Sequence, residues 1–225
     1  VALGTATFIM QASESVISIC FNASLLKYGD DIAVGAMTIL SSVMQFAMLP
    51  LQGIAQGSQP ITSYNYGARN SARVRQTFRL LVKVCLCYSV ALWAIIQLFP
   101  GIFTQIFTPN ADLVAFTVPA LRVYCAALFL FGIQIACQMT FVSIGYAVCS
   151  IIVAVLRKFI LLLPLIYLLP HLLADQTMAV YTAEPVADAI AVTCTAILFG
   201  VQFHKAMQKL EQEAETQNSP ASDAR

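Results

Sequence analysis

A row of polar residues recurs every three or four positions near the start of the chain, inside an apolar stretch. The row comprises Gln11, Glu14, Ser18 and Asn22. Residues at this spacing share one face of a helix, and polar groups inside a membrane face another helix or a watery cavity rather than lipid. A carboxylate there can exchange a proton or hold a metal or organic cation. The alternative is a structural carboxylate that hydrogen-bonds a neighbouring helix; we favour Glu14 as a cation-binding group.

Further polar residues could line the same cavity. Gln45 belongs to a polar series between residues 38 and 63, a stretch that Pro50 and Pro60 also interrupt. Gln134 and Gln138 lie one helical turn apart, and interhelical hydrogen bonds alone are an equal alternative for them. The residues that we expect to line a substrate cavity are Gln11, Ser18, Gln45, Gln134 and Gln138.

Enzymatic and metal chemistry are not indicated. His171 and His204, the two histidines, lie at the ends of apolar stretches, and the chain lacks HExxH, GxSxG and a glycine-rich phosphate loop. We expect no second acid or base to pair with Glu14 at depth. All seven cysteines lie in apolar stretches without a CxxC pair, which is typical of small residues at helix interfaces. We therefore expect no catalytic residue and no metal site.

The elements that must position these residues are membrane-spanning helices. The chain is 59% hydrophobic and 10% charged, with a mean hydropathy of +0.79, whereas about a quarter of the residues of a soluble domain are charged. Uncharged runs cover 32–68, 84–111 and 123–156, each near or above the roughly 20 residues that cross a bilayer. The net charge of +1, without a polybasic cluster, gives no sign of a nucleic-acid partner.

We therefore predict an all-α, polytopic bundle of six membrane helices over residues 1–209, because lipid cannot satisfy open backbone groups. The predicted spans are approximately Leu3–Leu26, Ile32–Gly57, Leu80–Phe107, Ala115–Ile144, Ala147–Leu169 and Thr177–Phe203.

Lysine and arginine predict which ends face the cytoplasm. They gather at 69–79 and after the sixth span, whereas Asp30, Asp112 and Asp175 lie at the other ends. Both basic regions are therefore expected to be cytoplasmic, including a polar tail at 210–225 that we expect to be disordered. The chain starts at Val1 without a signal-peptide n-region, which indicates a fragment.

Two of the predicted spans are imperfect. Arg157 and Lys158 interrupt the fifth, and we expect their long side chains to reach water near its inner edge. Glu184 and Asp188, one turn apart around Pro185, open the sixth. A helix start accounts for them as well as a functional role does.

A family resemblance rests on the segment GIAQGSQP at 53–60, which YNYGAR follows at 64–69. This run resembles the stretch that joins the second and third helices in the C-terminal lobe of the multidrug and toxic compound extrusion (MATE) family, nearest its MepA-like branch. The resemblance covers the chain except its tail. The supporting motifs, in family order, are Phe99-Pro100, Ile106-Phe107-Thr108, Pro119-Ala120-Leu121-Arg122, Leu156-Arg157-Lys158, Leu163-Pro164-Leu165 and Ala183-Glu184-Pro185-Val186-Ala187-Asp188.

The resemblance implies one lobe of a two-lobe multidrug antiporter of the plasma (inner) membrane, of the kind that confers antibiotic resistance. Entry of H+ or Na+, the coupling ion, would drive efflux of small lipophilic, often cationic drugs, with no cofactor. The N-terminal lobe and membrane lipid would be its partners. Glu14 resembles the acid that members use for cation binding in this lobe. The chain has Phe131-Gly132-Ile133-Gln134 where some sodium-coupled members carry Asp, so a complete sodium site is not expected.

The mechanism that follows is competition, in which Glu14 binds either the coupling ion or the cationic substrate. One alternative is a flippase for lipid-linked oligosaccharides of the same superfamily, which would need a basic cavity. Its only candidate cations are Arg122, Arg157 and Lys158. The other alternative is a fragment that inserts in the membrane but does not transport.

Overall fold

The computed structural model describes residues 2–146, 152 and 154–218, with side chains for 15–146, 152 and 154–213. The described chain is helical, as predicted. Its elements are α1 (Ala2–Tyr28), α2 (Asp31–Gly67), α3 (Ser71–Leu98), α4 (Pro100–Phe107), α5 (Ala111–Tyr124), the 3-10 turn η1 (Leu128–Leu130), α6 (Phe131–Ser143), the π-helical segment η2 (Leu156–Leu162), α8 (Leu163–Leu172) and α9 (Gln176–Asn218).

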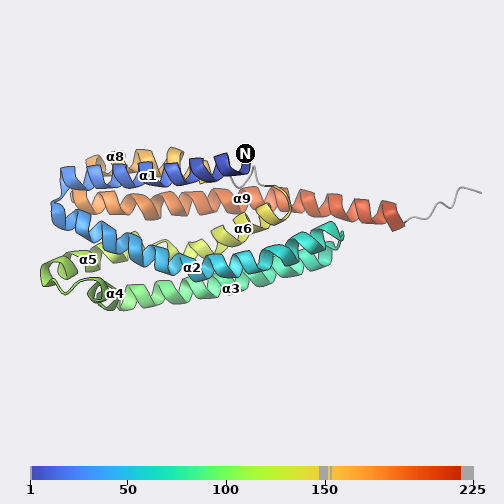
Figure 1. The fold of residues 1–225 in the computed structure, drawn as a ribbon, viewed down its shortest axis with the longest axis horizontal. Helices are drawn as coiled ribbons and strands as arrows, with labels where there is room; N and C mark the ends of the chain where they lie inside the picture. The colour runs from blue at the N-terminus through green and yellow to red at the C-terminus, as the bar shows by residue number, and fades with distance from the viewer. Residues whose placement is uncertain (1, 147–151, 153, 219–225) are drawn as a thin grey trace, which may run out of the picture.

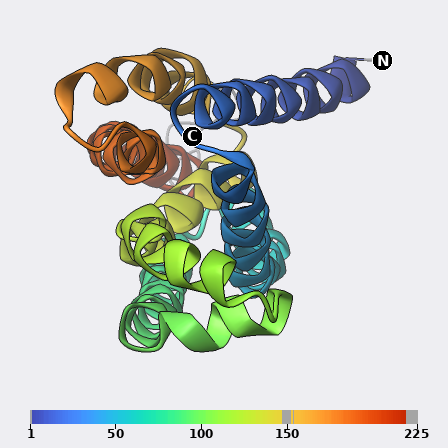
Figure 2. The same ribbon diagram turned by 90° about the vertical axis from the view of Figure 1, so that its left-hand side faces the viewer.

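Helices α3 and α9 run along the longest axis of the molecule (Figure 1), whereas α1 diverges from the bundle towards its N-terminus (Figure 2). We name the two ends by their charges. The acidic end carries Asp30, Asp112 and Asp175, and the basic end carries Arg69 and Arg75. Figure 2 looks along the bundle from the acidic end, with α1 and α2 neighbouring each other on one side and α3, α5 and α9 on another.

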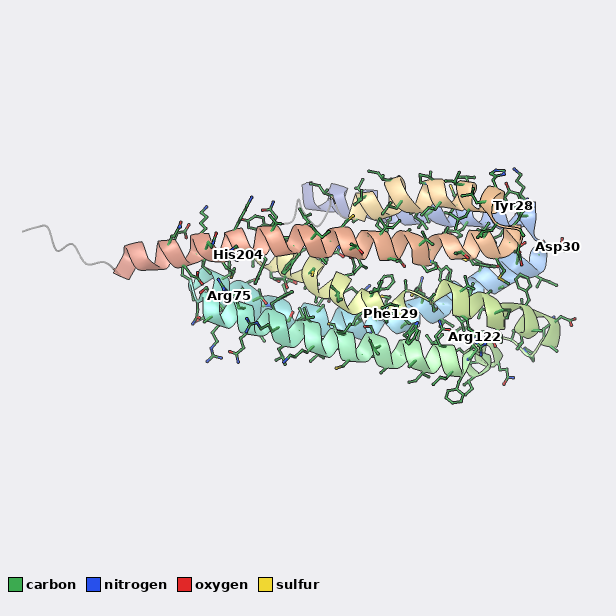
Figure 3. All side chains as sticks on the ribbon, turned by 180° about the vertical axis from the view of Figure 1, so that it is seen from behind. Tyr28, Asp30, Arg75, Arg122, Phe129 and His204 are labelled. Carbon is green, nitrogen blue, oxygen red and sulfur yellow. The ribbon has the colours of Figure 1, made fainter. Side chains whose placement is uncertain are left out.

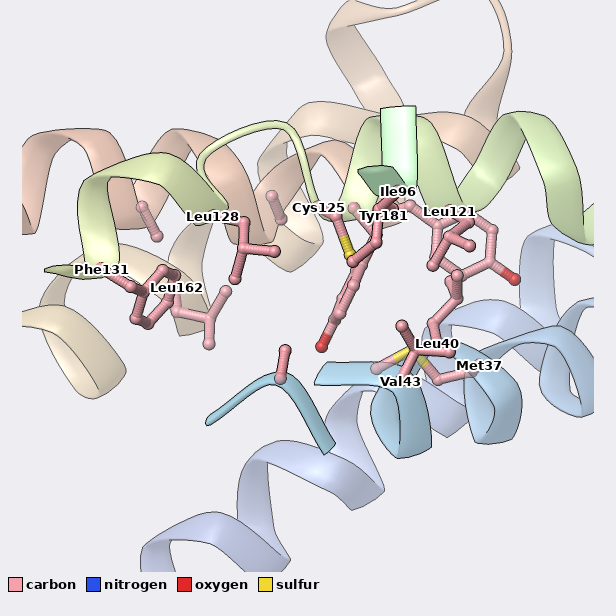
Figure 4. Packing of buried hydrophobic residues seen from close by; sticks show 14 of the residues in the cluster. Met37, Leu40, Val43, Ile96, Leu121, Cys125, Leu128, Phe131, Leu162 and Tyr181 are labelled. Carbon is pink, nitrogen blue, oxygen red and sulfur yellow. The ribbon is translucent and has the colours of Figure 1, made fainter. Parts of the chain in front are cut away.

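One apolar cluster joins the helices through the middle of the bundle. Leu25, Leu40, Leu121 and Ile166 are almost fully buried in it, although they come from α1, α2, α5 and α8. Figure 4 shows this packing around Tyr181 of α9, whose hydroxyl donates to the carbonyl oxygen of Ala33 at 2.7 Å. This hydrogen bond links the Tyr181 side chain of α9 to the start of α2 across the apolar cluster.

Several element boundaries differ from the prediction. Helix α2 continues through Pro50 and Pro60 to Gly67, because neighbouring helices can support proline inside a membrane helix. The third predicted span divides into α3 and α4 at Phe99-Pro100, since a proline suits the first turn of a new helix. Three helices, α2, α3 and α9, are long and apolar enough to cross a membrane among the described residues, and a fourth if α5 and η1–α6, bent by 41°, form one span. The six spans stay a prediction.

The expectation of a disordered tail from residue 210 is wrong as far as Asn218, where α9 ends. Met207 and Leu210 are buried against Val74, and the Glu211 carboxylate accepts from Ser71 and Arg75, both at 2.9 Å. These contacts extend α9. The polar composition of the tail does not predict them, because it does not reveal that α3 lies beside α9.

Candidate functional site

A polar stripe lies on the exposed side of α2. Thr38, Gln45, Gln52 and Gln56 are all exposed, and their spacing of seven, seven and four residues places them on one face of the helix. The buried residues of α2, such as Leu40 and Leu51, lie on the other side. Exposed amides at membrane depth are costly against lipid, so this face of α2 is suited to a watery cavity or another protein.

Helix α1 adds a second exposed polar side chain, Ser18, while its neighbours Ile17 and Phe21 are buried. Gln11 and Glu14 lie in α1 before Ser18, but their side chains are outside the described residues. The predicted role of Glu14 therefore stays a prediction.

The two glutamines of α6 are less accessible than the predicted cavity requires. Gln134 is buried, at 5% exposure, and Gln138 is half-buried. The side-chain oxygen of Gln134 is buried without a hydrogen-bond partner among the described residues. Ser18 and Gln45 are thus exposed on α1 and α2, whereas Gln134 belongs to the interior of the bundle.

A charged cluster inside the bundle joins η2 to α9. The Arg157 guanidinium donates from Nε to Asp188 Oδ1 at 2.5 Å and from Nη2 to Glu184 Oε1 at 2.9 Å. The Asp188 side chain is 2% exposed and that of Glu184 is 10% exposed. Arg157 also lies over the Phe131 ring, with its Cζ 5.1 Å from the ring centroid. One guanidinium therefore holds two carboxylates that lie one turn apart on α9.

The expected helix start at Glu184 is wrong, because α9 begins at Gln176 and both carboxylates lie two to three turns inside it. The Asp175 carboxylate supports the true start by accepting from the Met178 backbone N–H at 3.0 Å. Asp188 is thus a buried acid inside α9, and the expectation that no second acid or base pairs with Glu14 stays a prediction, because the Glu14 side chain is outside the described residues. A signal was present in the sequence, because an arginine and two acids in neighbouring apolar spans are expected to pair.

One carboxylate oxygen of Asp188 is not used by the arginine. Its Oδ2 is buried and has no hydrogen-bond partner in the described part of the chain, although Oδ1 is bound by Arg157. A buried acceptor without a donor is costly unless a proton, a water or a cation satisfies it. The cluster is therefore a second candidate for cation chemistry, besides Glu14.

No group of three or more His, Cys, Asp or Glu side chains among the described residues is arranged to hold a metal ion. The basic cavity that a flippase would need is not formed around Arg157, because its guanidinium is committed to Glu184 and Asp188.

The fourth span is broken between α5 and α6, and α3 satisfies the backbone groups that the break exposes. Ser89 Oγ, Trp93 Nε1 and Gln97 Nε2 donate to the carbonyl oxygens of Phe129, Ala126 and Arg122, at 3.0, 3.1 and 2.9 Å. The three donors are four residues apart and so form a ladder on one face of α3. Irregular backbone at membrane depth requires such partners.

The family model described as MatE matches residues 6–168. The "Multidrug export protein MepA" of Staphylococcus haemolyticus (strain JCSC1435) is 25% identical over 132 residues, which is 58% of this chain and 28% of that protein. The chain thus spans about a quarter of the length of this curated relative.

Solved structures show the same fold. The MATE multidrug transporter DinF-BH is 34% identical with a TM-score of 0.73, covering 87% of this chain and 43% of that one. An inward-facing and an outward-facing MATE family transporter of the MOP superfamily each match at 19% identity. Their TM-scores are 0.84 and 0.82, covering 93% of this chain and 47% and 46% of theirs. This chain therefore matches the inward-facing and the outward-facing structure about equally well. It spans less than half of each solved structure.

Proposed function

This chain belongs to the MatE family of multidrug transporters, and from that premise we propose that it is one lobe of an exporter that exchanges lipophilic cations for H+ or Na+. The family consists of transporters and not of enzymes, in agreement with the sequence. The chain matches less than half of the solved structures, so the second lobe is part of the proposal.

The observation that carries this proposal is the exposed polar stripe of α2, Thr38, Gln45, Gln52 and Gln56. The three amides, on the outside of a membrane helix, need a polar surrounding, whereas the Thr38 hydroxyl donates to the carbonyl oxygen of Val34 at 3.3 Å. A cleft between two lobes supplies it, and amides beside an apolar wall suit a ligand that is both lipophilic and polar. Ser18 is exposed on helix α1, which also carries Glu14.

Glu14 is the residue that we assign to cation exchange. It precedes Ser18 by one helical turn in α1, the helix that comes directly before α2 in the chain. A single carboxylate binds either the coupling ion or the cationic drug, and this competition couples the two movements. The similar match to inward- and outward-facing structures supports a lobe that moves as a unit while the cleft opens to alternate sides.

The test is Glu14→Gln in the full-length transporter, with a fluorescent lipophilic cation such as ethidium as substrate. We expect loss of ion-driven efflux with normal expression and membrane insertion, because glutamine keeps the shape and removes the exchangeable charge. Asp112→Asn, an exposed acid of the acidic end, is the matched control and is expected to transport normally. Retained pH- or sodium-dependent efflux in Glu14→Gln would contradict the role of Glu14.

The alternative of a non-transporting fragment has a separate test. Residues 1–225 alone, inserted in the membrane, are expected to show no efflux, whereas the full-length transporter does. Efflux by residues 1–225 alone would show that the cleft does not need a second lobe.

A further inference from the structure

A wide hollow of about 800 Å³ opens where α3, α5, η1 and α9 meet. It is not the polar surface of α1 and α2. Its walls are mostly apolar and include Phe129, Val186, Ala189 and Ile190, of which Phe129 is 36% exposed and Ile190 is 41% exposed. The break in the fourth span forms one wall, which Ala126, Phe129 and Leu130 line.

Among the described residues, Arg122 is the one charged side chain that lines this hollow. Its side chain is exposed, and its guanidinium makes no hydrogen bond or ion pair with any residue that the structure describes. Glu184 and Asp188, the acids within α9 on this part of the bundle, are committed to Arg157. A guanidinium beside an apolar membrane surface is costly without an anionic partner, and the described residues do not supply one to Arg122.

The position of Arg122 along the bundle identifies the kind of partner. Its carbonyl oxygen accepts from Gln97, the next-to-last residue of α3, so Arg122 lies near the acidic end of that helix. Figure 3 shows Arg122 between Phe129 and the end marked by Tyr28 and Asp30. The cation is thus at the rim of the membrane region, and the apolar walls continue from it towards the bilayer centre.

We propose that this hollow binds a membrane phospholipid, whose phosphate pairs with Arg122 while an acyl chain lies along Phe129, Val186 and Ala189. A guanidinium matches the two oxygens of a phosphate with a pair of N–H groups. A charged head at the rim and an apolar tail pointing inwards reproduce the polarity of the hollow. This inference is independent of the proposed transport function.

Trp93, the single tryptophan of the chain, lines the hollow and reports on its occupant. The chain is reconstituted in vesicles of a phosphate-free galactolipid, and phosphatidylglycerol with brominated acyl chains is titrated in. Bromine quenches tryptophan fluorescence at contact. Brominated galactolipid provides the comparison without a phosphate.

We expect brominated phosphatidylglycerol to quench Trp93 at a several-fold lower lipid fraction than brominated galactolipid. Arg122→Gln should reduce this preference to about one, since only the guanidinium recognises the phosphate. Arg79→Gln, which removes an exposed arginine near the basic end of α3, should leave the preference unchanged. Ala189→Phe fills the hollow with Arg122 intact and should weaken quenching by both lipids.

Three outcomes would overturn the proposal. The first is equal quenching by the two lipids in the wild-type chain, and the second is an unchanged preference in Arg122→Gln. The third is the absence of quenching by either lipid in the full-length transporter with other tryptophans replaced, which would mean that protein covers the hollow. Size-exclusion profiles that match the wild type establish that each variant is folded.

Discussion

At the scale of single residues, the arginine that interrupts the fifth predicted span is the centre of a buried ionic cluster. Arg157 pairs with Glu184 and Asp188, and its own side chain is 21% exposed. Removing one partner from such a cluster leaves a buried charge uncompensated, at a cost of about 3–5 kcal/mol. The cluster therefore fixes η2 against α9.

Arg157→Gln should accordingly lower the thermal stability of the detergent-solubilised protein strongly. Arg75→Gln is the matched control, because it removes an arginine from a pair with Glu211 in which the side chains are 37% and 45% exposed. Such pairs contribute about 0–1 kcal/mol. Fluorescence-detected size exclusion after heating measures both. Equal losses in the two variants would show that the buried cluster does not stabilise the fold.

The residue types indicated which polar and charged groups the helices carry, but not how those groups are arranged in space. Ser18 and Gln45 are exposed in the structure, and their role in lining a substrate cavity stays a prediction. The pairing of Arg157 with α9 was not predicted, because it depends on which helices are neighbours. The charges inside apolar spans signal that an ion pair forms, but which helices become neighbours is decided by tertiary packing.

At the scale of elements, the contact between α3 and α6 depends on Gly132. A Cβ atom at this position would lie 2.6 Å from the Cys85 carbonyl oxygen and 2.7 Å from Ser89 Oγ. No flexible side chain can move aside, because the first of these atoms belongs to the backbone. Ser89 also carries one rung of the ladder that supports the broken span.

Gly132→Ala is therefore expected to destabilise the protein by about 1–3 kcal/mol, as overpacking does. Gly53→Ala is the matched control, since a Cβ at Gly53, also inside a helix, meets nothing within 4 Å. Alanine favours a helix over glycine by up to about 1 kcal/mol, so this variant should be neutral or stabilised. Urea or heat denaturation of the two variants and the wild type measures the changes in the free energy of unfolding. A stable Gly132→Ala would contradict the close approach of the two helices.

The helical class followed from hydropathy, but the breaks did not. Pro119 lies inside α5, whereas the break comes at Cys125–Ala127, where no proline or glycine occurs. Side chains of α3 stabilise it from outside. A pattern confined to one span therefore could not place this break, nor could it show that contacts of Met207 and Leu210 extend α9.

At the scale of the whole molecule, two surfaces of the bundle differ in polarity and therefore in the surroundings that suit them. The side with α1 and α2 presents amides and a serine, and the side with α3, α5 and α9 presents an apolar hollow with one arginine among its described residues. The first is suited to a watery cleft and the second to lipid. In the proposal, the side with α1 and α2 therefore faces the second lobe, and the side with α3, α5 and α9 faces lipid.

The exchange of ion for drug is the central claim, and its most direct measurement uses everted membrane vesicles that contain the full-length transporter. An imposed pH gradient is monitored while ethidium is added, with and without sodium, and a sodium gradient is followed in the same way. We expect ethidium to dissipate one of the two gradients, and Glu14→Gln to abolish the response. An inserted, folded transporter that leaves both gradients unchanged would contradict coupled exchange.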